Sequence, residues 1–250
     1  MKLDRLIAVR NTKTVYRDGN RCIKVFYQCH SKADILNEAL NQARMEETGI
    51  KVPKIIEVTT IDGKWAIVSE YIKGKTMAQL IQEHPEEKAS HLAHLVQLQL
   101  SVLSETCNSL NDLKSKLRLG ITKASLDAAV KERLLSRLDA MPEQNHICHG
   151  DFFPSNIIIS EDDTPYIIDW SHAARGSACA DAAQTYLSFR LADDCEAAEN
   201  YIKHFCETAG MEMQAVREWI PMVAASRVFR EKKKECEILL SFANSTEFTP

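Results

Sequence analysis

His149-Gly150-Asp151-Phe152-Phe153-Pro154-Ser155-Asn156 is the stretch that decides the fold of this chain, together with Ile167-Ile168-Asp169-Trp170 shortly after it. Both stretches place polar side chains directly beside apolar runs that are typical of buried strands. The run Ile157-Ile158-Ile159 and the apolar residues before Asp169 predict a hairpin that is closed through residues 160–165. Such a hairpin brings Asn156 and Asp169 to the same end, where they are neighbours in space.

These polar side chains suit the transfer of a phosphoryl group. A protein that catalyses this reaction positions an acceptor hydroxyl, supplies ligands for a divalent metal and neutralises charge on the transferred group. On a loop, Asp151 can accept the proton or the hydrogen bond of a hydroxyl. Asn156 and Asp169 offer hard oxygen donors of the kind that Mg²⁺ prefers.

The two stretches resemble the aminoglycoside phosphotransferase and choline kinase-like superfamily, a relative of the protein kinases. The family's H-G-D-x-x-x-x-N and I-D-[FW] elements are both present, in order and at suitable spacing. The resemblance extends to Asp181, which stands where the family has an aspartate that anchors the catalytic loop. It implies that Asp151 is the catalytic aspartate and that Asn156 and Asp169 are metal ligands.

A lone lysine, Lys24, interrupts the apolar run Cys22-Ile23-Lys24-Val25-Phe26. Alternation along a strand allows this lysine to face outward. The resemblance implies instead the phosphate-binding lysine of a kinase-like lobe, paired with a glutamate on the next helix. Glu38 is the best-placed partner, because it lies in the first half of a helix predicted over residues 32–47.

The segment Ser69-Glu70-Tyr71-Ile72-Lys73-Gly74 resembles the hinge of the family. The resemblance implies that backbone groups of Glu70 and Ile72 meet the adenine edge of the nucleotide. Because backbone groups would make these contacts, the side chains do not indicate whether the nucleotide is ATP or GTP.

The sequence departs from the protein kinases in residues 9–14, where those proteins have a glycine-rich loop and this chain has no glycine. Members of the family often lack that loop pattern. Backbone amides or side chains of Asn11, Thr12 and Lys13 are the candidates for covering the phosphates.

The pattern of elements predicts an α+β chain with a two-lobed, protein-kinase-like fold. A small lobe over residues 1–72 has an antiparallel sheet, with turns at Asp18-Gly19 and Asp62-Gly63, and one helix. A larger, mainly helical lobe covers residues 73–250 and contains a short β insert. Helices are predicted at residues 77–81, 91–106, 125–138, 180–191, 197–209 and 213–230.

Composition limits the partners of the chain. The net charge of −4 argues against nucleic-acid and membrane surfaces, which need clustered positive charge. The basic residues Arg230, Lys232, Lys233 and Lys234 are interleaved with acids and are interpreted as a solvated helix face. There is no apolar run long enough to span a membrane and no secretory pattern at the N-terminus. Eight scattered cysteines then indicate reduced thiols and a cytoplasmic protein.

Several individual residues have a second interpretation. A two-histidine, one-carboxylate iron site can be written from His149, Asp151 and His172. That interpretation leaves Asn156 and Lys24 unexplained. The resemblance implies instead that His149 braces the loop. The acidic stretch over residues 193–199 can attract a cationic acceptor or form an ordinary solvated helix end. Arg227 can contact an anionic substrate or lie on a helix surface.

The sequence therefore predicts a Mg²⁺-dependent phosphotransferase that uses ATP or GTP and phosphorylates a hydroxyl of a small molecule. The resemblance admits aminoglycosides, macrolides, choline or ethanolamine, homoserine, thiamine and sugars as acceptors, and it leaves a role in antibiotic resistance open. The oligomeric state is not indicated. The alternative is a catalytically silent kinase-like protein that binds a nucleotide or a partner without turnover.

Overall fold

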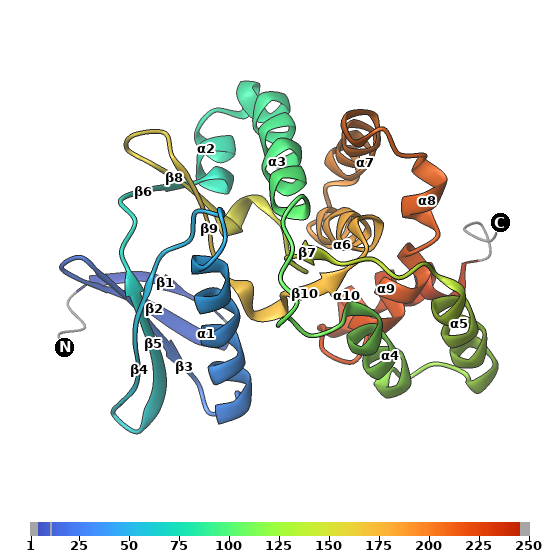
Figure 1. Ribbon diagram of the computed structural model, residues 1–250, viewed down its shortest axis with the longest axis horizontal. Coiled ribbons are helices and arrows are strands. Elements are labelled where there is room, and N and C mark those ends of the chain that lie inside the picture. The colour runs from blue at the N-terminus through green and yellow to red at the C-terminus, as the bar shows by residue number, and fades with distance from the viewer. Residues whose placement is uncertain (1–4, 11, 246–250) are drawn as a thin grey trace. The chain divides into compact units, whose positions relative to one another are not determined.

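The computed structural model describes residues 5–10 and 12–245. The chain forms two compact units that interleave along the sequence. The first unit extends to Pro85 and also contains Pro154–His172, and the second contains Glu86–Phe153 and the chain from Ala173 onward. The predicted α+β architecture, with an antiparallel N-terminal sheet and a larger helical part, is confirmed (Figure 1).

The first unit is built on a five-stranded antiparallel sheet with the strand order β1-β2-β3-β5-β4. Both predicted hairpins are present, and the turn between β4 and β5 has positive φ at Asp62 (48°) and Gly63 (73°). Positive φ at both central residues is what a tight two-residue hairpin turn requires. The strands are β1 (Arg5–Val9), β2 (Lys13–Asp18), β3 (Arg21–Phe26), β4 (Ile55–Ile61) and β5 (Lys64–Glu70).

One face of this sheet is covered by α1 (Lys32–Glu46), as Figure 1 shows. The helix begins at Ser31, whose hydroxyl caps the backbone of Asp34 while the Asp34 carboxylate returns the contact. Apolar residues alternate between the two faces of the strands. On the face under the helix, Phe26 and Ile67 pack against Ile35 and Ala39 of α1, and the opposite face carries Ile23, Val25, Ala66 and Val68.

A second, three-stranded sheet in the first unit has the order β6-β8-β9 and contains β6 (Gly74–Thr76), β8 (Ile157–Ser160) and β9 (Pro165–Ile167). Its strand β6 leads directly into α2 (Met77–Glu83). The pairing of β6 with β8 keeps residues 74–85 in the same compact unit as the N-terminal sheet. A functional boundary at residues 72–73 stays a prediction.

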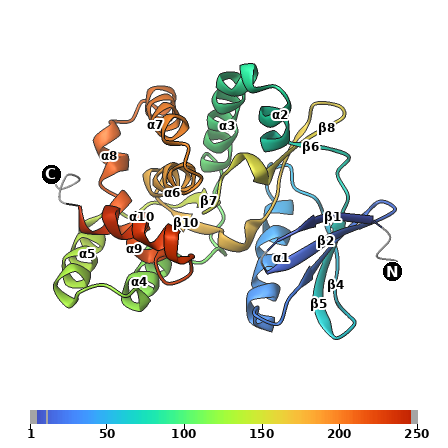
Figure 2. The same ribbon diagram turned by 180° about the vertical axis from the view of Figure 1, so that it is seen from behind.

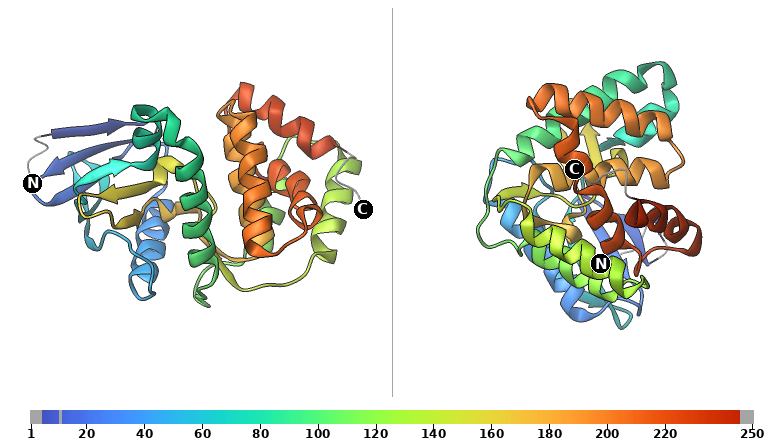
Figure 3. Two further views of the ribbon diagram at one scale, coloured as in Figure 1. Left: turned by 90° about the horizontal axis from the view of Figure 1, so that it is seen from above. Right: turned by 90° about the vertical axis from the view of Figure 1, so that its right-hand side faces the viewer.

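The second unit is mainly helical, with one short strand pair formed by β7 (His146–Cys148) and β10 (Ala174–Gly176). The orange helices α6 and α7 lie side by side, as seen from above in Figure 3. The helices α4, α5, α9 and α10 gather on the side that Figure 2 shows from behind. The helices are α3 (Lys88–Leu103), α4 (Leu113–Lys123), α5 (Ala128–Ala140), α6 (Ala178–Leu191), α7 (Cys195–Ala209), α8 (Met213–Arg217), α9 (Ile220–Arg227) and α10 (Lys233–Asn244).

The single helix predicted over residues 213–230 is wrong. The structure divides it into α8 and α9, which meet around Trp219. Pro221 explains the break, because proline has no backbone N–H to continue a helix and suits the first turn of a new one. The sequence pattern does not indicate the helices α4 and α10. Among the described residues, none of the helices has the length and apolar character needed to cross a bilayer.

Candidate active site

The hairpin that carries Asn156 and Asp169 has the predicted form. Ile157 pairs with Ile167, and the N–H of Ile168 donates to the carbonyl of Asn156 at 2.9 Å. Asn156 is buried. Asp169 has φ of 68°, a left-handed backbone that non-glycine residues seldom adopt and that concentrates at functional sites. The sequence therefore places both candidate metal ligands correctly at one end of the hairpin.

Four charged side chains meet next to that end. Lys24 on β3 forms an ion pair with Glu38 on α1, which is the predicted partner. The Nζ of Lys24 also lies 3.6 Å from Oδ1 of Asp169. Lys13, the first residue of β2, places its Nζ 2.7 Å from Oδ2 of the same aspartate. Two lysines and two carboxylates thus form a balanced, largely buried cluster.

The cluster fixes the charge states of its members. Burial alone would lower the pKa of Lys24, but Asp169 and Glu38 outweigh it and raise that pKa above its usual value. Burial alone would raise the pKa of Asp169, but Lys24 and Lys13 outweigh it and hold that pKa far below its usual range. Asp169 is therefore a carboxylate at every physiological pH, which is the form that binds a metal.

The residues present fit a Mg²⁺ ion that is completed by other ligands. The described part of the chain has no group of three or more His, Cys, Asp or Glu side chains placed to hold a metal. Asp169 and Asn156 supply one anionic and one neutral oxygen. Mg²⁺ is commonly held by one or two protein oxygens together with phosphates and water, so this sparse set suits it.

A cavity of about 570 Å³ opens beside the cluster within the first unit. Its lining includes Lys13, Lys24, Asn156 and Asp169 as well as residues 70–72. This volume is in the range of pockets that hold small ligands and cofactors. All six nucleotide and metal candidates except Glu38 line it, which is consistent with a nucleotide site.

The predicted hinge has backbone groups that face away from β3. The N–H of Tyr71 donates to the carbonyl of Asn20 at 2.9 Å, and Glu70 lies opposite Arg21. In an antiparallel pair, hydrogen-bonded and non-hydrogen-bonded positions alternate, so the N–H and carbonyl of Glu70 point to the other side. There the N–H donates to the carbonyl of Lys54 at 2.9 Å. The contacts of Glu70 and Ile72 with adenine stay a prediction.

The segment where a glycine-rich loop would stand is held by backbone hydrogen bonds that involve Thr12 and Lys13. The N–H of Arg10 donates to the carbonyl of Lys13, and the N–H of Tyr27 donates to the carbonyl of Thr12, both at 2.9 Å. Asn11, the first of the three candidates for covering the phosphates, lies outside the described residues. Of the other two, Lys13 is the one whose side chain reaches the Asp169 carboxylate.

In the second unit the loop with Asp151 is held by the predicted anchor. Gly150 has φ of 80° and donates its N–H to Oδ1 of Asp181 at 2.8 Å. Asp181 is fully buried and also accepts a hydrogen bond from Gln99 at 2.8 Å. Burial raises the pKa of the Asp181 carboxyl, and the bonds from Gln99 and Gly150 oppose that shift. The N–H of Asp151 donates to Nδ1 of His149, so the histidine braces the loop.

Two of the four acids in the stretch 193–199, before and within α7, make ordinary structural contacts. Asp194 caps the helix through the N–H of Ala197 and pairs with Lys88 at 2.6 Å. Glu199 accepts a hydrogen bond from the hydroxyl of Tyr186 at 2.8 Å. Asp194 and Glu199 thus stabilise the start of α7 and its packing, whereas Asp193 and Glu196 are exposed.

The sequence matches the model of a known protein family. The model describes the phosphotransferase enzyme family, and the match covers residues 10–219, which is more than half of the chain. The chain belongs to this family. A search of the curated proteins finds no match to this phosphotransferase-family sequence.

Solved structures share the fold of this phosphotransferase-family chain. An aminoglycoside-3'-phosphotransferase of type VIII is 18% identical, with a TM-score of 0.65 over 89% of this chain and 93% of that one. A thermostable aminoglycoside phosphotransferase APH(4)-Ia, in a ternary complex with AMP-PNP and hygromycin B, is 14% identical, with a TM-score of 0.68 over 96% and 94%. The choline kinase LicA from Streptococcus pneumoniae is 12% identical, with a TM-score of 0.61 over 97% and 93%. At these identities the likeness shows the fold, and the predicted kinase-like fold is confirmed.

Proposed function

We propose that this chain transfers a phosphoryl group from ATP or GTP to a hydroxyl of a small molecule. The observation that carries the proposal is the meeting of Lys13, Lys24, Glu38 and Asp169 at one end of a cavity of about 570 Å³. Membership of the phosphotransferase family supports the reaction type. The complexes of related folds with AMP-PNP or ADP support a nucleotide as the donor.

Each residue has a part in this proposal. Glu38 holds the ammonium group of Lys24 over the cavity, where it neutralises charge on the nucleotide phosphates. Asn156 and Asp169 hold Mg²⁺, which when bound screens the phosphate charge. In the second unit, Asp151 accepts a hydrogen bond from the acceptor hydroxyl and takes up its proton. Glu70 and Ile72 contribute backbone groups to the adenine.

Lys13 replaces the glycine-rich loop in this account. Without nucleotide, its ammonium is held by the Asp169 carboxylate at 2.7 Å. With a nucleotide and Mg²⁺ bound, the Asp169 oxygens would serve as metal ligands and the Lys13 ammonium would contact the phosphates instead. The eight cysteines are free thiols, which supports the cytoplasmic setting of the proposal.

One observation favours the silent alternative. Lys13 occupies an oxygen of Asp169 that a metal would need, and a lysine held there can block metal binding. A protein of this kind would bind a nucleotide or a partner without turnover.

To test the proposal, the full chain is incubated with Mg²⁺, ATP or GTP and a panel of hydroxyl compounds. The panel includes hygromycin B, choline, hydroxycarboxylates and sugars. New phosphate esters are detected by ³¹P NMR. Formation of an ester with any acceptor supports phosphotransfer. Nucleotide binding with no phosphorylated product across the panel would favour the silent alternative.

A matched pair of variants tests the metal ligand. Asp169→Asn should remove the tightening of nucleotide binding by Mg²⁺, a loss of about 10-fold or more for a ligand of this kind. Asp163→Asn is the control, because Asp163 is in the same hairpin and also has a left-handed backbone, with φ of 61°. Equal metal dependence in the two variants would remove Asp169 from the site.

A further inference from the structure

A second charged cluster lies in the other unit, around the loop that carries Asp151. Lys116 projects from α4, and its Nζ donates to the carbonyl of Ala173 at 3.2 Å. Ala173 directly precedes β10, where Ala174 pairs with Cys148 on the strand that leads into the catalytic loop. The ammonium group of Lys116 is therefore held beside that loop, and it interacts electrostatically with Cys148.

The packing of α4 against α9 fixes the approach of Lys116. Gly120, one turn along α4, lies so close to α9 that an added Cβ would come 2.4 Å from the carbonyl oxygen of Ser226. A larger residue at Gly120 would push the helices apart. The absence of a side chain there thus brings α4, and Lys116 with it, against the end of α9.

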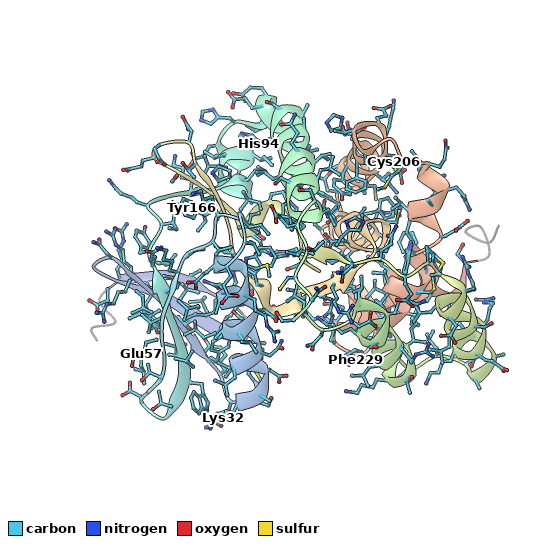
Figure 4. All side chains as sticks on the ribbon, in the orientation of Figure 1. Lys32, Glu57, His94, Tyr166, Cys206 and Phe229 are labelled. Atoms are coloured by element: carbon cyan, nitrogen blue, oxygen red, sulfur yellow. The ribbon has the colours of Figure 1, made fainter. Side chains whose placement is uncertain are left out.

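Arg230 reaches the same place from the segment after α9. Phe229, labelled in Figure 4, directly precedes it. The N–H of Arg230 donates to the carbonyl of Arg227 at 3.0 Å, and its Nε lies 3.7 Å from Oε1 of Glu231. Arg230 interacts with Asp151 attractively and with Lys116 repulsively. The sequence groups it with residues 232–234 as a solvated face, and Arg230 is exposed, as those three lysines are.

Arg227 completes the cluster but has a structural role. It is buried, it pairs with Glu231 at 3.2 Å, and it donates to the hydroxyl of Ser188 at 3.1 Å. It is thus neither a surface arginine nor positioned like Arg230. Its charge still adds to the positive potential, because burial and then Arg227 lower the pKa of Arg230 to about 10.

The cluster brings positive charges close together, which makes their protonated forms less favourable. Burial, and then the charge of Arg230, lower the pKa of Lys116 to about 8. Arg230 repels both Lys116 and Arg227, and the carboxylates of Glu231 and Asp151 attract it. Like charges held together in a partly buried place are typical of sites that bind an ion of the opposite sign.

We infer that Lys116 and Arg230 bind an anionic group of the acceptor, so that the molecule presented to Asp151 is a hydroxyl compound with a carboxylate or a phosphate group. This inference rests on the proposed phosphotransfer, because it identifies the cluster beside Asp151 as part of the acceptor site. A polycationic aminoglycoside would bring like charge to Lys116 and Arg230. Of the acidic residues in the stretch 193–199, Asp194 and Glu199 are already engaged in structural contacts.

The experiment measures binding to the full chain by calorimetry, with four hydroxyl compounds of different charge. D-glycerate carries a carboxylate, glycerol 3-phosphate carries a phosphate, glycerol is neutral and hygromycin B is a polycation. At least one of the two anions should bind with a Kd below about 1 mM, in the range of ordinary KM values. Glycerol and hygromycin B should bind at least about 10-fold more weakly, since an ion pair of the right sign would be missing.

Variants locate the site and separate it from the nucleotide cavity. Lys116→Gln and Arg230→Gln should each weaken the anion about 10-fold or more, the effect of removing one charge partner in a partly buried pair. Lys203→Gln is the control, because Lys203 is a lysine on α7 whose side chain is 67% exposed, and it should change the affinity less than about twofold. Lys13→Met should also leave it unchanged, because Lys13 lies in the other unit.

Each outcome decides the inference. If neither anion binds at about 10 mM, or if Lys116→Gln binds as well as the unaltered chain, the acceptor site is not anionic. Binding that depends on Lys13 and not on Lys116 would place the anion in the nucleotide cavity and overturn the inference. Phosphorylation of hygromycin B but of neither anion would leave the proposed function standing and refute this inference. Lys116-dependent anion binding without any phosphorylated product would support the anion site and count against the proposed function.

Discussion

Replacing Glu38 with glutamine tests the ion pair on which the nucleotide site depends. The amide keeps the shape of the side chain and removes its charge. Glu38 is 6% exposed and Lys24 is 18% exposed, so the pair is shielded from water. Two unit charges in hydrogen-bonding contact attract by about 5 kcal/mol at an effective dielectric constant of about 20. Breaking a buried pair by removing one partner costs about 3–5 kcal/mol.

Asp169 reduces that cost. Its Oδ1 lies 3.6 Å from the Nζ of Lys24, so the ammonium group keeps one carboxylate partner after Glu38 is neutralised. We therefore expect Glu38→Gln to lower the free energy of unfolding by about 2–3 kcal/mol, below the full cost of a broken pair. For a chain of this size that corresponds to a fall in Tm of about 4–12 °C. Nucleotide affinity should fall by about 10-fold, since Lys24 is drawn toward Asp169 and away from the phosphates.

Urea unfolding and a fluorescent-nucleotide titration measure the two effects on the same preparations. Glu47→Gln is the control, because Glu47 is an exposed glutamate just beyond the end of the same helix. It should change the free energy of unfolding by less than about 0.5 kcal/mol. If Glu38→Gln behaved like Glu47→Gln in both assays, Glu38 would not position Lys24 and the reasoning would fail.

Three further variants or conditions probe the two units separately. Lys13→Met should weaken the binding of metal-free nucleotide by about 10-fold. It leaves Asp169 available to Mg²⁺, so the dependence of nucleotide affinity on Mg²⁺ should grow. An unchanged affinity for metal-free nucleotide in a titration would count against a contact between Lys13 and the phosphates. Gly150→Ala forces a side chain into a backbone with φ of 80° and should cost about 1–2 kcal/mol in urea unfolding; a cost near zero would show that the loop relaxes freely. Burial and Arg230 lower the pKa of Lys116 to about 8. Affinity for the anionic acceptor should therefore be full below pH 8 and fall by up to about 10-fold per pH unit above it. A flat calorimetric profile from pH 7 to 9 would exclude Lys116 from the contact.

The first unit was largely predictable from the sequence because its information is local. Asp-Gly turns between β-branched runs specify the hairpins. The alternation along β3 puts Lys24 on the face covered by α1, and Glu38 is in the half of that helix which can reach it. The hairpin of β8 and β9 brings Asn156 and Asp169 together by register alone.

Long-range contacts could not be predicted in the same way. Lys13 and Asp169 are 156 positions apart, and no periodic pattern distinguishes this lysine from a surface one. Lys116 belongs to a helix that was not predicted, and its position depends on the close packing of Gly120 against α9. Arg230 is exposed like the lysines that follow it, and charge spacing in sequence does not show that Arg230 interacts with Asp151.

Asp151→Asn is the most direct test of the central claim, that this chain is a phosphotransferase in which Asp151 orients and deprotonates the acceptor hydroxyl. The rate of phosphate-ester formation is followed by ³¹P NMR with the best acceptor, and nucleotide affinity is measured in parallel. We predict that transfer falls by about 10²–10⁴-fold, the usual contribution of a general base. Nucleotide affinity should stay within about threefold, because Asp151 and the nucleotide cavity belong to different units. Transfer by Asp151→Asn at a rate close to that of the unaltered chain would contradict the account.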